Sequence, residues 1–112
     1  MSAGGVRTGP VDFERVNRAA LRNSLAVVSV LLPDGAKSGQ EWTARNPMRP
    51  DHRPGSFRIN LVTGRWSDFA TGDKGGDLVA LAAYVGSLSQ REAAIRLADS
   101  LGVDPFEGTR NA

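Results

Sequence analysis

The chain contains no cysteine and one histidine, His52. Disulfide bonds are therefore excluded, and a structural zinc site, built from soft thiolate and imidazole ligands, would have a single nitrogen donor. No cysteine nucleophile exists, and no local pattern of serine, histidine and aspartate indicates a triad. We expect a protein that is not an enzyme by itself and has no cofactor. The lack of cysteine also fits the reducing cytoplasm, where we expect this protein to be.

Long apolar runs are also missing. No run approaches the roughly 20 residues that a membrane-spanning helix needs, and the start MSAGGVRTGPV has no apolar block typical of a signal peptide. The 112 residues suffice for one small hydrophobic core. We expect one domain over residues 10–104, with flexible tails at 1–9 and 105–112 and no membrane partner.

The net charge of +2 is unevenly distributed along the chain. Between Arg45 and Arg65 there are five arginines against one acid, Asp51, which gives +4, while the nine basic and eleven acidic residues elsewhere give −2. Guanidinium groups match phosphate oxygens and always carry charge, so this cluster favours a nucleic-acid partner. The alternative is an arginine-rich surface that only contacts solvent.

The first third of the chain predicts one long helix. Pro10 suits a first helical turn, and acidic residues follow it. Apolar residues then recur at helical spacing as far as Leu32, before the turn Pro33-Asp34-Gly35. They are Phe13, Val16, Ala20, Val27 and Leu31. The apolar run Leu25–Leu32 is also compatible with a strand.

The middle of the chain predicts a small antiparallel sheet. Residues 41–44 indicate a short strand, and residues 56–61 alternate, with apolar residues on one face and Arg58 on the other. Val62-Thr63-Gly64 is typical of a hairpin connection, and residues 65–69 return as the partner strand. The residues expected to be buried beneath the helices are Trp42, Phe57, Ile59 and Phe69.

Two helices are predicted at the end. Asp77 is suited to cap the first, whose apolar stripe stops at Gly86. Ser89 and Glu92 form a capping box for the second, which stops at Gly102. The predicted fold class is α+β: a small antiparallel β-hairpin or three-stranded sheet, packed with an N-terminal helix and two C-terminal helices.

The stretch 42–77, about a third of the chain, resembles the N-terminal zinc-binding domain, a zinc ribbon, of bacterial and phage DNA primases. That family carries an aromatic residue, Cys-Pro-x-His, an acidic residue, a Pro-Ser-Phe strand, aromatic-x-Cys-Phe-x-Cys, and Gly-Gly-Asp opening a helix. The matching scaffold residues are Trp42, Pro47, Asp51, Pro54, Ser56, Phe57, Trp66, Phe69, Gly75, Gly76 and Asp77. The four ligand positions hold Asn46, Arg49, Asp68 and Thr71, and Gly55 is one extra residue.

The resemblance implies a degenerate zinc ribbon that has kept its scaffold and lost its metal. We therefore expect the purified domain to contain no stoichiometric zinc. A hard cation held by oxygen ligands is an alternative. Its candidate ligands are Asp51, Asp68, Asp73 and Asp77, but their spacing does not match a calcium loop, and single acids in turns usually cap backbone amides.

The candidate nucleic-acid-binding residues are Arg45, Arg49, His52, Arg53, Arg58, Arg65, Trp66 and Lys74. Trp66 suits stacking on a base or packing in the core, depending on the hairpin register, whereas Trp42 is expected in the core. The loop 72–77 invites a phosphate-binding interpretation. It lacks the Gly-Lys-Ser/Thr ending of a nucleotide-binding loop. This leaves Lys74 as a single candidate contact with the phosphate backbone of a nucleic acid.

In replicative primases the corresponding domain helps to engage the single-stranded template. The resemblance thus implies a non-catalytic accessory domain that holds single-stranded DNA for a primase, polymerase or helicase partner, or for a missing C-terminal portion. Two alternatives stay open. One is a protein-interaction or structural module of a mobile-element replication protein without direct DNA contact. The other is an enzyme fragment whose primase activity needs the full-length protein.

Overall fold

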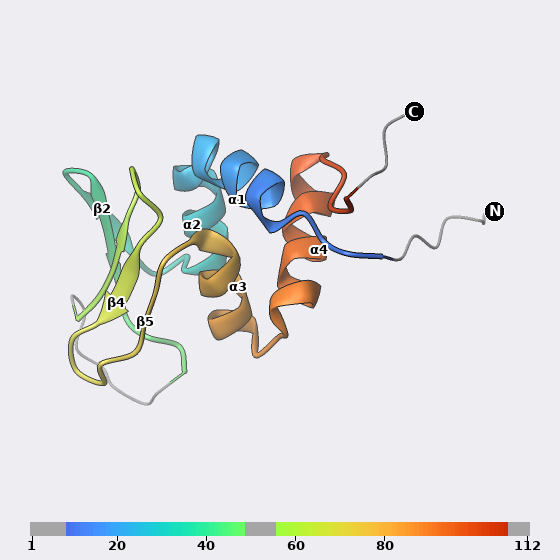
Figure 1. The fold of residues 1–112 in the computed structure, drawn as a ribbon. Helices are drawn as coiled ribbons and strands as arrows, with labels where there is room; N and C mark the ends of the chain where they lie inside the picture. Colours follow the sequence, from blue (N-terminus) through green and yellow to red (C-terminus); the bar gives the residue numbers. More distant parts are fainter. Residues whose placement is uncertain (1–8, 49–55, 108–112) are drawn as a thin grey trace.

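The computed structural model of the protein describes residues 9–48 and 56–107. Four helices and a sheet make up this part of the chain, and Figure 1 shows the sheet on one side and the helices on the other, with α4 farthest from the sheet. In chain order the elements are α1 (Phe13–Arg22), α2 (Ser24–Leu31), β1 (Ala36–Ser38), β2 (Glu41–Ala44), β3 (Phe57–Asn60), β4 (Trp66–Asp68), β5 (Lys74–Gly75), α3 (Leu78–Gly86) and α4 (Gln90–Leu101).

The sheet has five antiparallel strands in the order β1-β2-β3-β4-β5. Its centre is the predicted hairpin of β3 and β4, flanked by the predicted strand β2. The hairpin turn is closed by the Asn60 carboxamide oxygen, which accepts from the backbone N–H groups of Val62 and Thr63, and by Gly64 at a φ of 81°. The predicted α+β class is confirmed. The short edge strands β1 and β5 were not predicted.

Strand alternation separates an apolar inner face from a polar outer face. Trp42, Ile59 and Trp66 lie opposite one another on neighbouring strands and point toward the helices. The outer face carries the row paired with Arg58, which includes Thr43, Ser67 and Lys74. The sheet therefore uses one face for the core and exposes the other.

The N-terminal segment forms two helices, not the single helix that its apolar spacing predicted. The break falls at Asn23, whose side chain donates to the Ala19 carbonyl, while the Ser24 hydroxyl donates to the Leu61 carbonyl in the hairpin turn. Side-chain bonds of this kind compete with the helical ladder and favour a break. The alternative of a strand at Leu25–Leu32 is wrong, since α2 covers this run.

The helix caps follow the sequence closely. The Asp77 carboxyl accepts from Ala80 N–H at the start of α3, and Ser89 and Glu92 form the predicted capping box of α4. Gly102 ends α4 in the left-handed conformation. The end of α3 differs, because Gly86 is its last helical residue and Ser87 takes the left-handed position.

The packed part of the chain continues past the boundary predicted at Asp104. Phe106 is buried and forms a β-bridge with Val11 beside α1. The Arg15 guanidinium donates to the carbonyl oxygens of Asp104 and Phe106, which ties this segment to α1. None of the helices in the described residues is long and apolar enough to cross a membrane.

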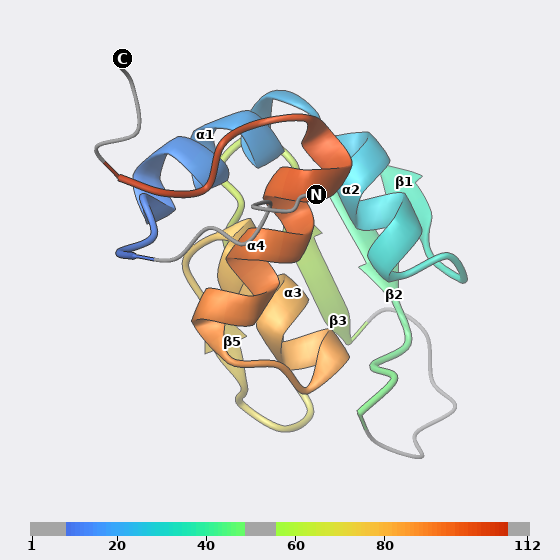
Figure 2. The ribbon, with the colours of Figure 1, turned by 90° about the vertical axis from the view of Figure 1, so that its right-hand side faces the viewer.

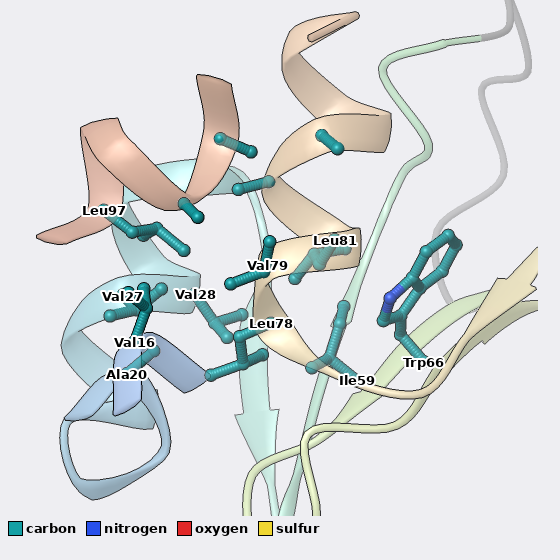
Figure 3. Packing of buried hydrophobic residues seen from close by; sticks show 14 of the residues in the cluster. Val16, Ala20, Val27, Val28, Ile59, Trp66, Leu78, Val79, Leu81 and Leu97 are labelled. Carbon is teal, nitrogen blue, oxygen red and sulfur yellow. The ribbon is translucent and has the colours of Figure 1, made fainter. Parts of the chain in front are cut away.

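Helix α3 lies at the centre of the hydrophobic core. Figure 3 shows Leu78 and Leu81 of α3 between side chains of the N-terminal helices and the sheet residues Ile59 and Trp66. Viewed from the helical side, α4 lies in front of α3 and the sheet lies behind (Figure 2). The core thus joins the two layers through α3.

Gly75 is required for steric reasons, whereas its neighbour Gly76 is not. A Cβ atom on Gly75 would lie 2.5 Å from ring atoms of Trp66, whereas a Cβ atom on Gly76 would meet no heavy atom within 4 Å. The backbone of β5 therefore covers the indole of Trp66 at a distance that only glycine allows.

We predict that Gly75→Ala lowers the free energy of unfolding by about 1–3 kcal/mol, because Trp66 or β5 must move to admit the methyl group. Gly76→Ala is the matched control and should change stability by less than about 0.5 kcal/mol. Urea unfolding of both variants measures the difference. Equal losses in the two variants would contradict the proposed steric role of Gly75.

Candidate nucleic-acid interface

The outer face of the sheet collects basic side chains from two strands and from the end of the hairpin turn. Arg58 on β3 and Lys74 on β5 lie in one row across the sheet, and Arg65 follows the hairpin turn. All three are exposed. They border a shallow depression of about 730 Å³, which also contacts Glu41, Asn60 and Phe69. This surface could bind an anionic polymer.

Phe69 supplies the aromatic surface of this face. Its side chain is 69% exposed, and the Arg58 guanidinium carbon lies 5.5 Å from its ring centroid. The prediction that Phe69 is buried is therefore wrong. Trp66 and Asp68 point inward, so alternation turns Ser67 and Phe69 outward. Counting that alternation from an inward Trp66 would have identified Phe69 from the sequence.

Trp66 is a core residue, so its predicted role in base stacking is not supported. It is 5% exposed, its indole N–H donates to the Asp77 carbonyl, and its ring centroid lies 4.9 Å from that of Tyr84. The other tryptophan, Trp42, is buried as expected, and its indole N–H donates to the Leu32 carbonyl. Neither indole is available to a nucleobase.

The predicted arginine cluster is only partly described by the structure. Arg45 is exposed directly after β2, and Arg58 lies 3.9 Å from Glu41, an acid that weakens the positive potential of the outer face. Arg49, His52 and Arg53 lie outside the described residues.

The Gly-Gly-Asp loop is already occupied by protein groups where a phosphate would bind. At the start of α3, the Ala80 N–H donates to the Asp77 carboxyl and the Val79 N–H donates to the Asn17 carboxamide oxygen of α1. These amides would have to break both bonds to hold an anion. The arrangement favours a structural role for this loop. Its exposed Lys74 remains a candidate contact for a phosphate.

Two of the positions that correspond to metal ligands are joined directly by a hydrogen bond. The Asn46 carboxamide donates to the Asp68 carboxyl at 2.8 Å, and both residues are buried. The other carboxyl oxygen of Asp68 accepts from the Ala70 N–H. The amide and the carboxyl thus contact each other where the resemblance implies two zinc ligands.

The remaining positions do not complete a zinc site. Thr71 accepts from the Asp73 N–H through its hydroxyl, and Arg49 lies outside the described residues. Amide, carboxyl and hydroxyl oxygens are poor ligands for zinc compared with thiolates and imidazoles. Within residues 9–48 and 56–107, no three acidic or histidine side chains gather in a way that could hold a metal. These residues therefore do not fit zinc.

Tyr84 of α3 extends this polar cluster and was missed in the sequence. Its hydroxyl accepts from the Asn46 carboxamide at 2.7 Å and donates to the Asp73 carboxyl at 2.7 Å. Its ring packs against Trp66 and Phe57. Because 38 residues separate Asn46 from Tyr84, no local pattern indicates the contact. We refer to Asn46, Asp68, Asp73 and Tyr84 as the polar cluster.

Burial raises the pKa of the Tyr84 phenol above its ordinary value. The hydrogen bond to Asp73 and the negative charges of Asp73 and Asp68 raise that pKa further, while the hydrogen bond from Asn46 lowers it. The folded-state pKa lies above that of an unfolded chain, near 10. The stability from Tyr84 is thus complete below about pH 10 and is lost as the pH rises through the folded-state pKa.

We predict that Tyr84, the one tyrosine of the chain, titrates at higher pH in the folded than in the urea-unfolded protein. Ultraviolet absorbance of tyrosinate follows this residue alone. Asp73→Asn should move the folded-state pKa down, because it removes a neighbouring negative charge. Above about pH 10 the wild type should lose stability as this phenol ionises, and Tyr84→Phe should lack that contribution. Equal pKa values in folded and unfolded protein would refute the cluster geometry.

Comparison with known proteins finds similarity to a solved structure. No family model matches the chain, and no curated protein matches it. The fold is similar to a crystal structure of the Aquifex aeolicus primase containing its zinc-binding and RNA polymerase domains, with a TM-score of 0.71 and 23% identity. The match covers 94% of this chain and 24% of the primase chain, so this chain spans about a quarter of that structure. The likeness supports the fold expected from the primase resemblance.

Proposed function

We propose that this chain is a non-catalytic accessory domain of a primase or replication system, and that it holds single-stranded DNA template on the outer face of its sheet. The observation that carries the proposal is the combination of exposed Phe69 with Arg58, Arg65 and Lys74 on one surface. An aromatic ring stacks on any base, and basic side chains neutralise phosphates. The fold shared with part of a primase supports the same conclusion.

Single-stranded DNA is the form of nucleic acid that suits this surface best. A stacking contact with Phe69 requires an unpaired base, which a duplex does not offer at its surface. The guanidinium of Arg58 lies against the same ring and supports it from the protein side. Arg65 directly precedes β4 and Lys74 lies on the neighbouring strand β5, so both add positive charge to the surface that includes Phe69.

We also propose that the domain folds without zinc. In the zinc ribbon the metal connects two turns, and here the Asn46–Asp68 hydrogen bond connects the corresponding segments. The aromatic contacts of Trp66, Tyr84 and Phe57 add packing directly beside this bond. Together, in this proposal, these interactions replace the structural role that the metal has in zinc ribbons.

The polymerising activity would belong to a partner. The similar primase structure contains an RNA polymerase domain in addition to its zinc-binding domain, and this chain spans 24% of that structure. We propose that the corresponding catalytic unit is a separate chain or a part of the protein beyond this sequence. A protein-interaction module with no DNA contact is the competing proposal, and it is supported by an apolar groove on the helical side.

We predict salt-sensitive binding of single-stranded DNA, with a dissociation constant in the micromolar range or weaker. Each phosphate contact should contribute about −0.7 to the slope of log affinity against log salt. Arg65→Gln and Lys74→Gln should each flatten this slope by about that amount. Phe69→Ala should leave the slope unchanged and weaken binding by about 1–3 kcal/mol. Fluorescence anisotropy with labelled DNA at several salt concentrations measures both quantities.

Two controls separate this interface from general charge effects. Arg96→Gln removes an exposed arginine from α4 on the helical side, and it should not alter the slope. Duplex DNA of the same length should lose little affinity on Phe69→Ala, since its bases are already stacked. An equal effect of Arg96→Gln and Lys74→Gln, or binding that ignores salt, would favour the protein-interaction module.

A further inference from the structure

The helical side of the molecule exposes an apolar groove between α2, α3 and α4. Its volume is about 450 Å³, and its lining is mostly apolar, with Val30, Val85, Leu88 and Leu97 among the residues and Arg96 as the charged one. These residues belong to the helices and to the turn between α3 and α4. The groove is therefore separate from the outer face of the sheet, and a ligand of one surface does not compete with a ligand of the other.

Helix α2 is mostly apolar. Its sequence SLAVVSVL contains no charged residue, and its polar side chains are two serines. Val27 and Val28 are buried, while Leu25 is 45% exposed and Val30 is 78% exposed on the other side of the helix. A solvent-exposed helix normally carries charged or polar residues on its outer face. The exposed side of α2 is largely apolar, and no element among the described residues covers it.

The charges at the two ends of this apolar stretch have opposite signs. Arg22 lies six residues before Val28, and Asp34 lies six residues after it. Both are exposed, and neither forms an ion pair within the part of the chain that the structure describes. A two-fold axis at the level of Val28 would bring Arg22 of one copy opposite Asp34 of the other, twice in each dimer.

We propose that this surface pairs with a second copy of the chain, with the two α2 helices antiparallel. Two-fold pairing brings one patch against the same patch, so the patch must be complementary to itself. Helix α2 meets this condition, because it is uncharged and is flanked by Arg22 at the end of α1 and by Asp34 in the turn before β1. Val30 of each copy then packs over the groove of the other, and the two outer sheet faces remain free for DNA.

Sedimentation equilibrium of the full chain over a range of concentrations tests this proposal. The wild type should form a reversible dimer. Val30→Lys should weaken dimerisation at least about tenfold, because an ammonium group would be buried against a mostly apolar groove that already contains Arg96. Val62→Lys is the matched control, since Val62 is 55% exposed on the hairpin turn, and it should dimerise like the wild type. Circular dichroism checks that both variants fold.

Charge reversal tests the antiparallel register separately and does not touch the core. Arg22→Asp or Asp34→Arg alone should weaken the dimer by about tenfold, because two attractive pairs become repulsive. The double reversal should restore the affinity to within about twofold. A monomer at all concentrations, equal effects of the two valine variants, or no rescue by the double reversal would overturn the proposal. A monomer whose groove binds another polypeptide would likewise assign this surface to a different partner.

Discussion

The hydrogen bond between Asn46 and Asp68 holds together two parts of the chain that local structure alone would leave apart. Asn46 follows β2, and Asp68 ends β4. Both side chains are buried, so each must find a partner within the protein. Because the donor and acceptor contact each other directly, the turns that carry them stay in register with the sheet.

In a zinc ribbon the metal contributes on the order of 10 kcal/mol to folding, whereas a hydrogen bond to a carboxylate contributes about 1.5–3 kcal/mol. The proposed metal-free fold therefore needs packing to supply the difference. Tyr84 provides part of it, because its hydroxyl bonds to Asn46 and its ring lies against Trp66 and Phe57. Gly75 then lets β5 close over the same indole. The polar cluster and the aromatic packing are therefore one structural unit.

The same unit determines which side chains reach the outer face. With Trp66 and Asp68 held inward, alternation along the chain directs Ser67 and Phe69 outward. Phe69 consequently lies beside Arg58, the exposed residue of β3. The proposed DNA interface therefore depends on the inward orientation of Trp66 and Asp68 in β4.

The sequence predicted the elements whose signals are local. The alternation of apolar and polar residues predicted β3, and the capping residues predicted α3 and α4. It missed the break at Asn23, because competing side-chain bonds interrupt an otherwise helical apolar pattern. It also left the direction of Trp66 open and wrongly expected Phe69 to be buried, since the direction of a side chain in a strand depends on the pairing register. The family resemblance identified positions 46 and 68, but only the structure joins them to Tyr84.

A double-mutant cycle between Asn46 and Asp68 tests the central claim most directly. The free energy of unfolding would be measured for the wild type, Asn46→Ala, Asp68→Ala and the double variant, with a zinc chelator present throughout. All four proteins should fold without metal, and Asn46 and Asp68 should be coupled by about 1.5–3 kcal/mol, as expected for a hydrogen bond to a carboxylate. Additive losses, or a wild type that unfolds when zinc is removed, would contradict the claim.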